Sequence, residues 1–260
     1  MVLRQQAGHR MRKALLLLGL WLAAAAVPAR ADERILSWHS HIEVEKSGDL
    51  VVTETIRVRT EGDRIKRGIY RDIPLLLEDR FQPLRKLLAL PLTKPFEVVS
   101  VKRDGNKENY RAESIGEWGI RIRIGRADVF LKPGSYTYQI TYRTEGQLSF
   151  EKDRDVLYWN VNGTGWGFPT DKVTATVTLP EGIKGSKVGG STGKHGEQGK
   201  DYKATITKAG ATITATRPFR AGENLAVVLE WPPKQLDAAV YGIRKPLPTE
   251  DPRSAERPVR

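Results

Sequence analysis

Few residues of this chain could carry catalytic chemistry, because it contains no cysteine and only four histidines. His9 lies in an N-terminal stretch that we expect to be removed. His195 lies in a glycine-rich segment that could not hold a general base in place. A pair of His195 and Ser191 would leave the histidine without an orienting acid. We therefore predict that the protein is not an enzyme.

His39, His41 and Glu43 alternate along one segment, so in a strand they would point to the same side and could meet a metal ion. Two histidines and a carboxylate on a solvent-facing strand more often bind nothing. We therefore expect no metal.

Gly193 and Lys194 invite comparison with a phosphate-binding loop. Val188 occupies the position where that motif needs its first glycine, and His195 stands where a serine or threonine would bind magnesium. The sequence therefore predicts no cofactor and no nucleotide.

The octapeptide at 67–74, RGIYRDIP, places two arginines around an apolar segment that we interpret as a loop. Glu54 lies on the apolar face of a nearby predicted strand. A buried carboxylate needs a cationic partner, because breaking such a pair costs about 3–5 kcal/mol. Arg67 and Arg71 follow Glu54 closely in the sequence. We predict that Glu54, Arg67 and Arg71 form a structural clasp and that Tyr70 fills the core.

The same octapeptide could also contribute to a surface groove for a sugar polymer or a peptide. A second stretch, YWNVNGTGWGFP at 158–169, gathers aromatic rings around a glycine-rich turn. Rings stack on apolar faces, and a guanidinium binds acids at two points. The clasp and the groove are compatible, since one arginine can serve each. The candidate binding residues are Tyr70, Arg71, Asp72, Trp159, Asn160 and Trp166.

The segments that must position these side chains alternate between apolar and polar residues, which is typical of half-buried strands. Leu50, Val52 and Glu54 would share one strand face. Glycine-containing turns separate successive apolar runs, as at 104–105. The predicted strands are 36–44, 50–59, 96–102, 108–114, 119–125, 135–143, 172–179, 202–207, 211–216 and 224–231.

This pattern predicts an all-β fold, a single elongated antiparallel β-sandwich of immunoglobulin-like or β-saddle type over residues 33–232. Two small sandwich lobes that meet near residue 150 are the alternative. The glycine-rich segment at 185–200 has too little apolar content to pack, so we expect a long mobile hairpin loop there. Leucines at 81–92 predict a short turn that covers one end of the sandwich.

The two ends of the chain have compositions of their own. Residues 1–31 combine a basic start, an apolar run at 14–27 and an Ala-x-Ala site, which predicts a signal peptide cleaved after Ala31. Export through the general secretory pathway would place the protein in the periplasm or outside the cell. A retained N-terminal anchor is the alternative. Residues 233–260 are rich in proline and charge and predict a disordered tail.

The net charge narrows the choice of partners. The whole chain carries +12, and residues 1–31 contribute five Lys/Arg and no Asp/Glu, so +7 remains on the rest. In an exported protein this excess favours an anionic wall polymer or a lipid surface over nucleic acid. Charge that only maintains solubility is the alternative.

Six short motifs follow one another in order: SGDLVVTE at 47–54, RGIYRDIP at 67–74, LKPGSYTYQITYRTEG at 131–146, LYWNVNGTGWGFP at 157–169, VTATVTLPEG at 173–182 and AGENLAVVLEWP at 221–232. Over residues 35–232 the chain thereby resembles the exported N-terminal domain of the YciQ-like predicted bacterial membrane proteins, a family of unknown function. The resemblance implies an extracytoplasmic β-domain and no known reaction. Such domains are usually followed by transmembrane helices, whereas this sequence ends after a proline-rich tail. We therefore expect either a freestanding soluble version or a membrane partner on another chain. The strand order is also similar to the N-terminal β-saddle of zinc aminopeptidases, whose H-E-x-x-H motif is absent.

These observations predict an exported, non-catalytic binding or assembly module of the bacterial cell envelope. Its expected partner is an envelope or membrane protein, with no nucleic acid and no nucleotide. A carbohydrate-binding module or a degenerate hydrolase that acts on wall polymers is the alternative. Exposure of Trp118, Trp159 and Trp166 on one concave strip would favour that alternative.

Overall fold

The structure, a computed structural model, describes residues 32–75, 95–116 and 119–243. The predicted signal peptide at 1–31, the predicted turn at 81–92, Trp118 and residues 244–260 of the predicted tail lie outside these ranges. The described residues from Glu33 onward belong to one compact unit, which favours a single domain over two lobes.

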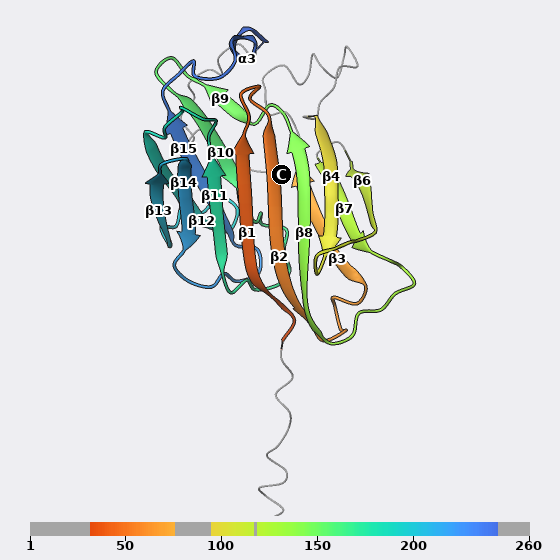
Figure 1. Ribbon diagram of the computed structural model, residues 1–260. Coiled ribbons are helices and arrows are strands. Elements are labelled where there is room, and N and C mark those ends of the chain that lie inside the picture. The colour runs from red at the N-terminus through yellow and green to blue at the C-terminus, as the bar shows by residue number, and fades with distance from the viewer. Residues whose placement is uncertain (1–31, 76–94, 117–118, 244–260) are drawn as a thin grey trace, which may run out of the picture. The chain divides into compact units, whose positions relative to one another are not determined.

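The described residues are nearly all β-structure, as predicted, and the largest sheet has eight strands. Its spatial order is β13 (Tyr202–Thr207), β14 (Gly210–Ala215), β11 (Val173–Thr178), β1 (Arg34–Val44), β2 (Leu50–Thr60), β8 (Gly134–Thr144), β4 (Phe96–Arg103) and β5 (Asn106–Lys107) (Figure 1). Neighbouring strands are antiparallel except β1 and β11, which pair in parallel. This one parallel pair departs from the expected antiparallel sandwich.

Two smaller sheets pack on the eight-stranded sheet and share one core with it. The four-stranded sheet has the order β12 (Lys187–Gly193), β15 (Asn224–Trp231), β10 (Asp155–Asn160) and β9 (Leu148–Phe150). The three-stranded sheet has the order β3 (Gly68–Pro74), β7 (Gly119–Gly125) and β6 (Tyr110–Ile115). The described domain is therefore a sandwich with one large layer facing two smaller ones.

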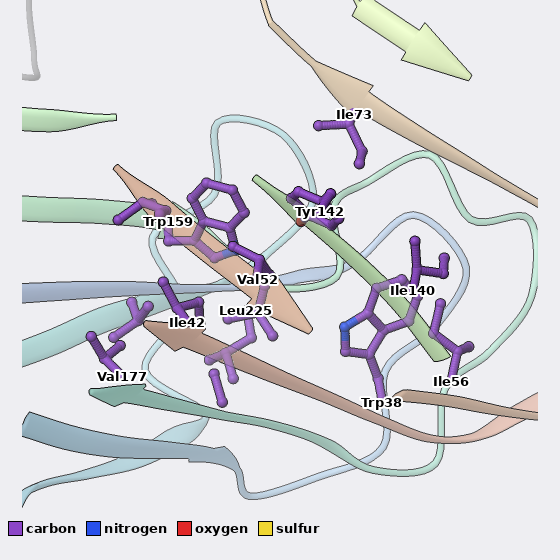
Figure 2. Packing of buried hydrophobic residues seen from close by; sticks show 14 of the residues in the cluster. Trp38, Ile42, Val52, Ile56, Ile73, Ile140, Tyr142, Trp159, Val177 and Leu225 are labelled. Carbon is purple, nitrogen blue, oxygen red and sulfur yellow. The ribbon is translucent and has the colours of Figure 1, made fainter. Parts of the chain in front are cut away.

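Inward-facing side chains of β2 and β8 form the centre of the core, because buried and less buried residues alternate along both strands. Leu50, Val52, Glu54 and Ile56 all point inward from β2 and are fully buried. Tyr142 of β8 lies directly opposite Val52. Figure 2 shows the packed side chains Trp38, Ile42, Val52, Ile56, Ile73, Ile140, Tyr142, Trp159, Val177 and Leu225. Burial of this cluster supplies the main driving force for folding, since the chain has no cysteine to cross-link.

The glycine-rich segment at 185–200 is not a mobile hairpin loop, and the prediction is wrong for Lys187–Gly193, which form β12. This strand pairs along its whole length with β15. A Cβ atom on Gly190 would lie 2.1 Å from the carbonyl oxygen of Ala226 and 2.8 Å from Cδ1 of Ile213. Glycine therefore permits the close approach of the strand to its neighbours, so the composition that suggested a loop serves packing instead.

The octapeptide that contains the two arginines is also a strand rather than a loop. It pairs with β7 from Gly68 to Pro74. The strand begins at Gly68, where φ is +141° and an added Cβ would lie 1.8 Å from the carbonyl oxygen of Ile124. From this point the side chains alternate between the core and solvent.

The predicted tail begins with residues that pack on the domain. Ala238–Ile243 form the short helix α3, and Val240 is buried against the sandwich. The backbone N–H of Asp237 donates to the carbonyl oxygen of Lys46 at 2.9 Å. Ordered structure therefore extends beyond the expected boundary at residue 232. Within the described ranges, no helix has the length and apolar character needed to cross a bilayer.

Candidate functional site

A buried ion pair joins the eight-stranded sheet to the three-stranded sheet. Arg71 of β3 donates from Nε to Oε2 of Glu54 on β2 and from Nη2 to Oε1, and each bond is 2.7 Å long. Glu54 is completely buried and Arg71 is 5% exposed. Charge-assisted hydrogen bonds with this two-point geometry are stronger than hydrogen bonds between neutral groups. The structure thus brings Glu54 and Arg71 together in the arrangement of the predicted clasp.

Two further groups complete this polar cluster. The hydroxyl of Tyr142 donates to Oε1 of Glu54 at 2.9 Å. The remaining Nη1 of Arg71 donates to the carbonyl oxygen of Asp72 at 2.9 Å and of Asn162 at 3.4 Å. Because both charged groups have partners beyond each other, the cluster meets the condition under which a buried ion pair is tolerated.

The surroundings move two pKa values away from their usual range. Burial alone would lower the pKa of Arg71, but the charge and hydrogen bonds of Glu54 reverse that effect and raise it. Burial raises the pKa of Tyr142 well above its usual value, and the negative charge of Glu54 adds to the effect. A permanent cation and a hydroxyl that keeps its proton are poorly matched to acid–base catalysis near neutral pH.

Aromatic rings enclose the ion pair. Cζ of Arg71 lies 5.1 Å from the ring centroid of Trp38. Trp166 meets Trp38 edge-on with centroids 5.2 Å apart, and Trp159 stacks on Tyr142 at 6.5 Å. Figure 2 shows Trp38, Tyr142 and Trp159 within the buried cluster. These rings therefore pack around the clasp.

Arg67 does not take part in the clasp, and that part of the prediction is wrong. Its guanidinium lies on the surface with Cζ 4.2 Å from the ring centroid of Phe130. The inward face of β3 starts only after Gly68, so Arg67 precedes the alternation that turns Arg71 toward Glu54.

Tyr70 and Asp72 lie on the opposite face of β3 from Arg71. Tyr70 is 51% exposed, so the prediction that it fills the core is wrong. Asp72 accepts two hydrogen bonds of 2.7 Å from Arg121 of β7. The three residues were candidates for lining one groove, and strand alternation places Arg71 on the opposite face of β3 from Tyr70 and Asp72.

The residues expected from the second aromatic stretch are also dispersed. Trp159 is 7% exposed on the inner face of β10. Asn160 is exposed, and its Oδ1 accepts a bond of 2.7 Å from Nδ2 of Asn224. Trp166 is half-buried, and its Nε1 donates to the carbonyl oxygen of Asn162 at 3.0 Å. Trp159 and Trp166 therefore provide no exposed strip on which a sugar could stack.

The two strand histidines bond to neighbouring threonines. Nδ1 of His39 lies 2.8 Å from Oγ1 of Thr174, and Nε2 of His41 lies 2.9 Å from Oγ1 of Thr178. Among the residues that the structure describes, no three or more His, Cys, Asp or Glu side chains gather where they could hold a metal ion.

Sequence reasoning missed Tyr142 and Asn162 as partners of the clasp. Tyr142 shares the inward face of β8 with Ile140, so strand phase could have placed it near Glu54. Asn162 lies in the glycine-rich turn of the stretch at 158–169 and was not among the candidate residues. Its side chain donates to the carbonyl oxygen of Glu223 at 2.8 Å and accepts from the N–H of Leu225 at 2.9 Å. No local pattern signals such a contact between distant segments.

Comparison with solved structures finds distant matches at low sequence identity. Leukotriene A4 hydrolase from Saccharomyces cerevisiae is 13% identical with a TM-score of 0.44, over 76% of this chain and 29% of that one. The M1 zinc metallopeptidase from Deinococcus radiodurans is 13% identical with a TM-score of 0.41, over 76% of this chain and 42% of that one. Similarity this distant carries no information about the activity of this chain.

Sequence comparison finds a closer similarity. The chain is 28% identical over 226 residues to the uncharacterized protein YciQ of Escherichia coli strain K12, which covers 84% of this chain and 34% of that protein. This chain thus spans about a third of the length of that relative. A family model described as "Predicted membrane protein (DUF2207) N-terminal domain" matches residues 34–231. This span contains the six ordered motifs up to Trp231 and the fifteen strands of the described residues. The chain therefore belongs to this family of predicted membrane proteins, of which it carries the N-terminal domain.

Proposed function

We propose that the protein is an exported, non-catalytic binding or assembly module of the bacterial cell envelope whose partner is an envelope or membrane protein. The observation that carries the proposal is the outer face of the three-stranded sheet. There Tyr70 stands 51% exposed between Arg121 and Arg123. Tyrosine and arginine are enriched among the residues that dominate protein–protein binding energy.

The side chains of this face are held in place before any partner binds. Nη1 of Arg123 donates to the hydroxyl of Tyr70 at 3.0 Å, and its Nη2 donates to Glu113 at 2.9 Å. Arg121 is fixed by its two bonds to Asp72. Ordered side chains reduce the entropy lost on association, so this face is suited to specific binding.

Two other observations support a binding role over catalysis. The charged groups of Glu54 and Arg71 bond to each other inside the fold, and their burial keeps them from contact with a substrate. The family description places this domain at the N-terminus of predicted membrane proteins, which supports a partner in or near a membrane.

Photo-crosslinking in cells tests the proposal. A photoreactive phenylalanine analogue would replace Tyr70 in one strain and Tyr110 in a control strain. Both tyrosines are exposed on the three-stranded sheet, on β3 and β6 respectively. We expect the probe at position 70, but not at 110, to form an adduct with an envelope or membrane protein, and Arg123→Ala to reduce it. Equal adducts from both positions, none from either, or capture of wall polymer alone would contradict the proposal.

A further inference from the structure

Three chain connections meet around a cavity at the end of the domain where β2 leads to β3. The cavity has a volume of about 370 Å³. This is at the small end of the range for sites that bind small molecules. The lining comes from the β2–β3 connection, the β4–β5 hairpin with the residues after it, and the β7–β8 connection. The lining residues are Arg67, Arg103, Asp104, Asn106, Lys107, Glu108, Asn109, Arg126 and Val129.

The two carboxylates of the lining are engaged by the fold itself. Oδ1 of Asp104 accepts the backbone N–H of Thr137 at 2.8 Å. Oε1 of Glu108 accepts the backbone N–H of Asn109 at 2.9 Å, and its Oε2 lies 2.8 Å from Nε of Arg103. Asp104 thus helps to shape the hairpin, and Glu108 also neutralises Arg103, one of the four cations of the lining.

The other cations are less fully neutralised. Arg126 pairs with Asp128, an exposed acid outside the lining. Within the described ranges, Arg67 and Lys107 have no carboxylate within ion-pair distance. The lining thus carries four cations against two carboxylates, a formal excess of two positive charges, which favours an anion.

The position of the Arg67 guanidinium is restricted by its neighbours. The guanidinium lies over the ring of Phe130, with Cζ 4.2 Å from the centroid, and this stacking limits its conformations. The N–H of Leu131 donates to the carbonyl oxygen of Lys66 at 2.8 Å, so the two connections that supply the arginine and the ring are tied together. A guanidinium fixed in this way binds phosphate oxygens with little further loss of entropy.

We propose that this cavity binds a small group that carries a phosphate, with Arg67 and Lys107 as the residues that recognise the anion. The guanidinium fork would bind two phosphate oxygens and the Lys107 ammonium would act as a point charge. The volume leaves room for an attached polyol, and the side-chain amides of Asn106 and Asn109 line the cavity. Nδ2 of Asn106 donates to the carbonyl oxygen of Asp104 at 3.4 Å, which leaves its Oδ1 to accept from a hydroxyl.

Tyr70, Arg121 and Arg123 are not part of the cavity lining. A negative result for phosphate binding would therefore not bear on the proposed protein partner, and the reverse also holds.

Calorimetric titration of the purified full chain with glycerol 3-phosphate tests the site at low ionic strength, with glycerol as the neutral comparison. A second arm measures co-sedimentation with phosphatidylglycerol vesicles against phosphatidylcholine vesicles. Lys107→Gln and Arg67→Gln each remove one cation from the cavity. Arg111→Gln is the matched control, because it removes the same charge from a side chain that is 80% exposed on β6 and outside the cavity.

We expect saturable binding of the phosphate compound or of the anionic vesicles, about tenfold weaker in each cavity variant and unchanged in the control. Binding to the free compound identifies a soluble phosphate as a sufficient ligand. Binding to vesicles alone, with the same dependence on Arg67 and Lys107, identifies a lipid headgroup. Absence of saturable binding in both arms, or an equal loss in Arg111→Gln, would overturn the proposal.

Discussion

Arg71 and Glu54 form their two-point ion pair between two sheets and not within one. Glu54 lies on β2 of the large sheet, and Arg71 lies in the middle of β3, an edge strand of the three-stranded sheet. An apolar contact at this place would tolerate sliding, whereas two directional bonds to one carboxylate do not. The pair therefore fixes how the three-stranded sheet is seated on the large sheet.

Breaking one side of this pair should be strongly destabilising. Glu54→Gln leaves the guanidinium of Arg71 buried without a counter-charge, and we expect the free energy of unfolding to fall by about 3–5 kcal/mol. Glu54→Leu combined with Arg71→Met should lose far less than the sum of the single changes, because apolar replacement of both partners is often neutral. Urea denaturation of the single and double variants measures the difference.

The half-exposed ion pair of Arg121 and Asp72 provides the control for the Glu54 and Arg71 substitutions. Their side chains are 37% and 27% exposed, so Arg121→Met should cost no more than about 1 kcal/mol. A Glu54→Gln variant as stable as the wild type would show that the buried pair does not hold the sheets together.

The two adjacent glycines of β12 give a second prediction. Gly190→Ala would place a methyl group 2.1 Å from the carbonyl oxygen of Ala226, so we expect a loss of at least about 1–3 kcal/mol from overpacking. Gly189→Ala is the matched control, because the nearest atom to its added Cβ is the hydroxyl of Tyr202 at 3.8 Å. Thermal unfolding of both variants distinguishes a packed strand from a loop. Equal losses of stability at both positions would contradict the pairing of β12 with β15.

The strands could be predicted where both faces carry a clear pattern. Glu54 could be assigned to the buried face because Leu50, Val52 and Ile56 share its phase. The need for a cation near that carboxylate then followed from the cost of burying a charge. Local sequence was therefore enough to predict the fold class and the burial of Glu54.

The remaining features depend on contacts between segments far apart in the chain. The glycines of β12 carry no side chain to report burial, so only the neighbouring backbone of β15 reveals their role. Arg67 and Arg71 look equivalent in the octapeptide, and the choice between them depends on where pairing with β7 begins. The parallel pairing of β1 with β11 likewise has no local signature.

The carboxylate of Glu33 should make stability depend on acid pH. It accepts the backbone N–H groups of Glu61, Asp63, Arg64 and Ile65 and the hydroxyl of Thr60. Burial alone would raise the pKa of Glu33, but the four backbone hydrogen bonds lower it from 4.5 to about 2. A lowered pKa means that the stabilisation is complete above pH 4.5 and is lost as the pH falls toward 2.

Glu33→Gln should therefore lower the melting temperature at pH 6, and the difference from the wild type should shrink as the pH falls below 4.5. Melting curves over a pH series measure this. Glu43→Gln changes the same charge on a side chain that is 52% exposed, and it should leave the curve almost unaltered. A difference between wild type and Glu33→Gln that persists unchanged at pH 2 would show that the ionised carboxylate is not responsible.

The contact between Asp155 and Tyr241 ties α3 to the sandwich. Asp155 is fully buried on β10, and its Oδ2 accepts the hydroxyl of Tyr241 at 2.6 Å. Burial raises the pKa of Asp155, and the bond from Tyr241 opposes that rise without cancelling it. A carboxyl with a raised pKa destabilises the fold once it ionises, so this group makes the protein more stable as the pH falls toward 3.8.

Removal of the hydroxyl by Tyr241→Phe should increase the destabilisation that the ionised carboxylate of Asp155 causes. We expect a loss of about 1–3 kcal/mol at neutral pH, where the buried carboxylate loses a donor. The loss should be smaller near pH 3, where the carboxyl group is protonated in both folded and unfolded chains. Chemical denaturation at the two pH values measures this, with Tyr110→Phe, an exposed tyrosine on β6, as the control. Equal losses at both pH values would mean that Tyr241 contributes packing alone and does not stabilise the Asp155 charge.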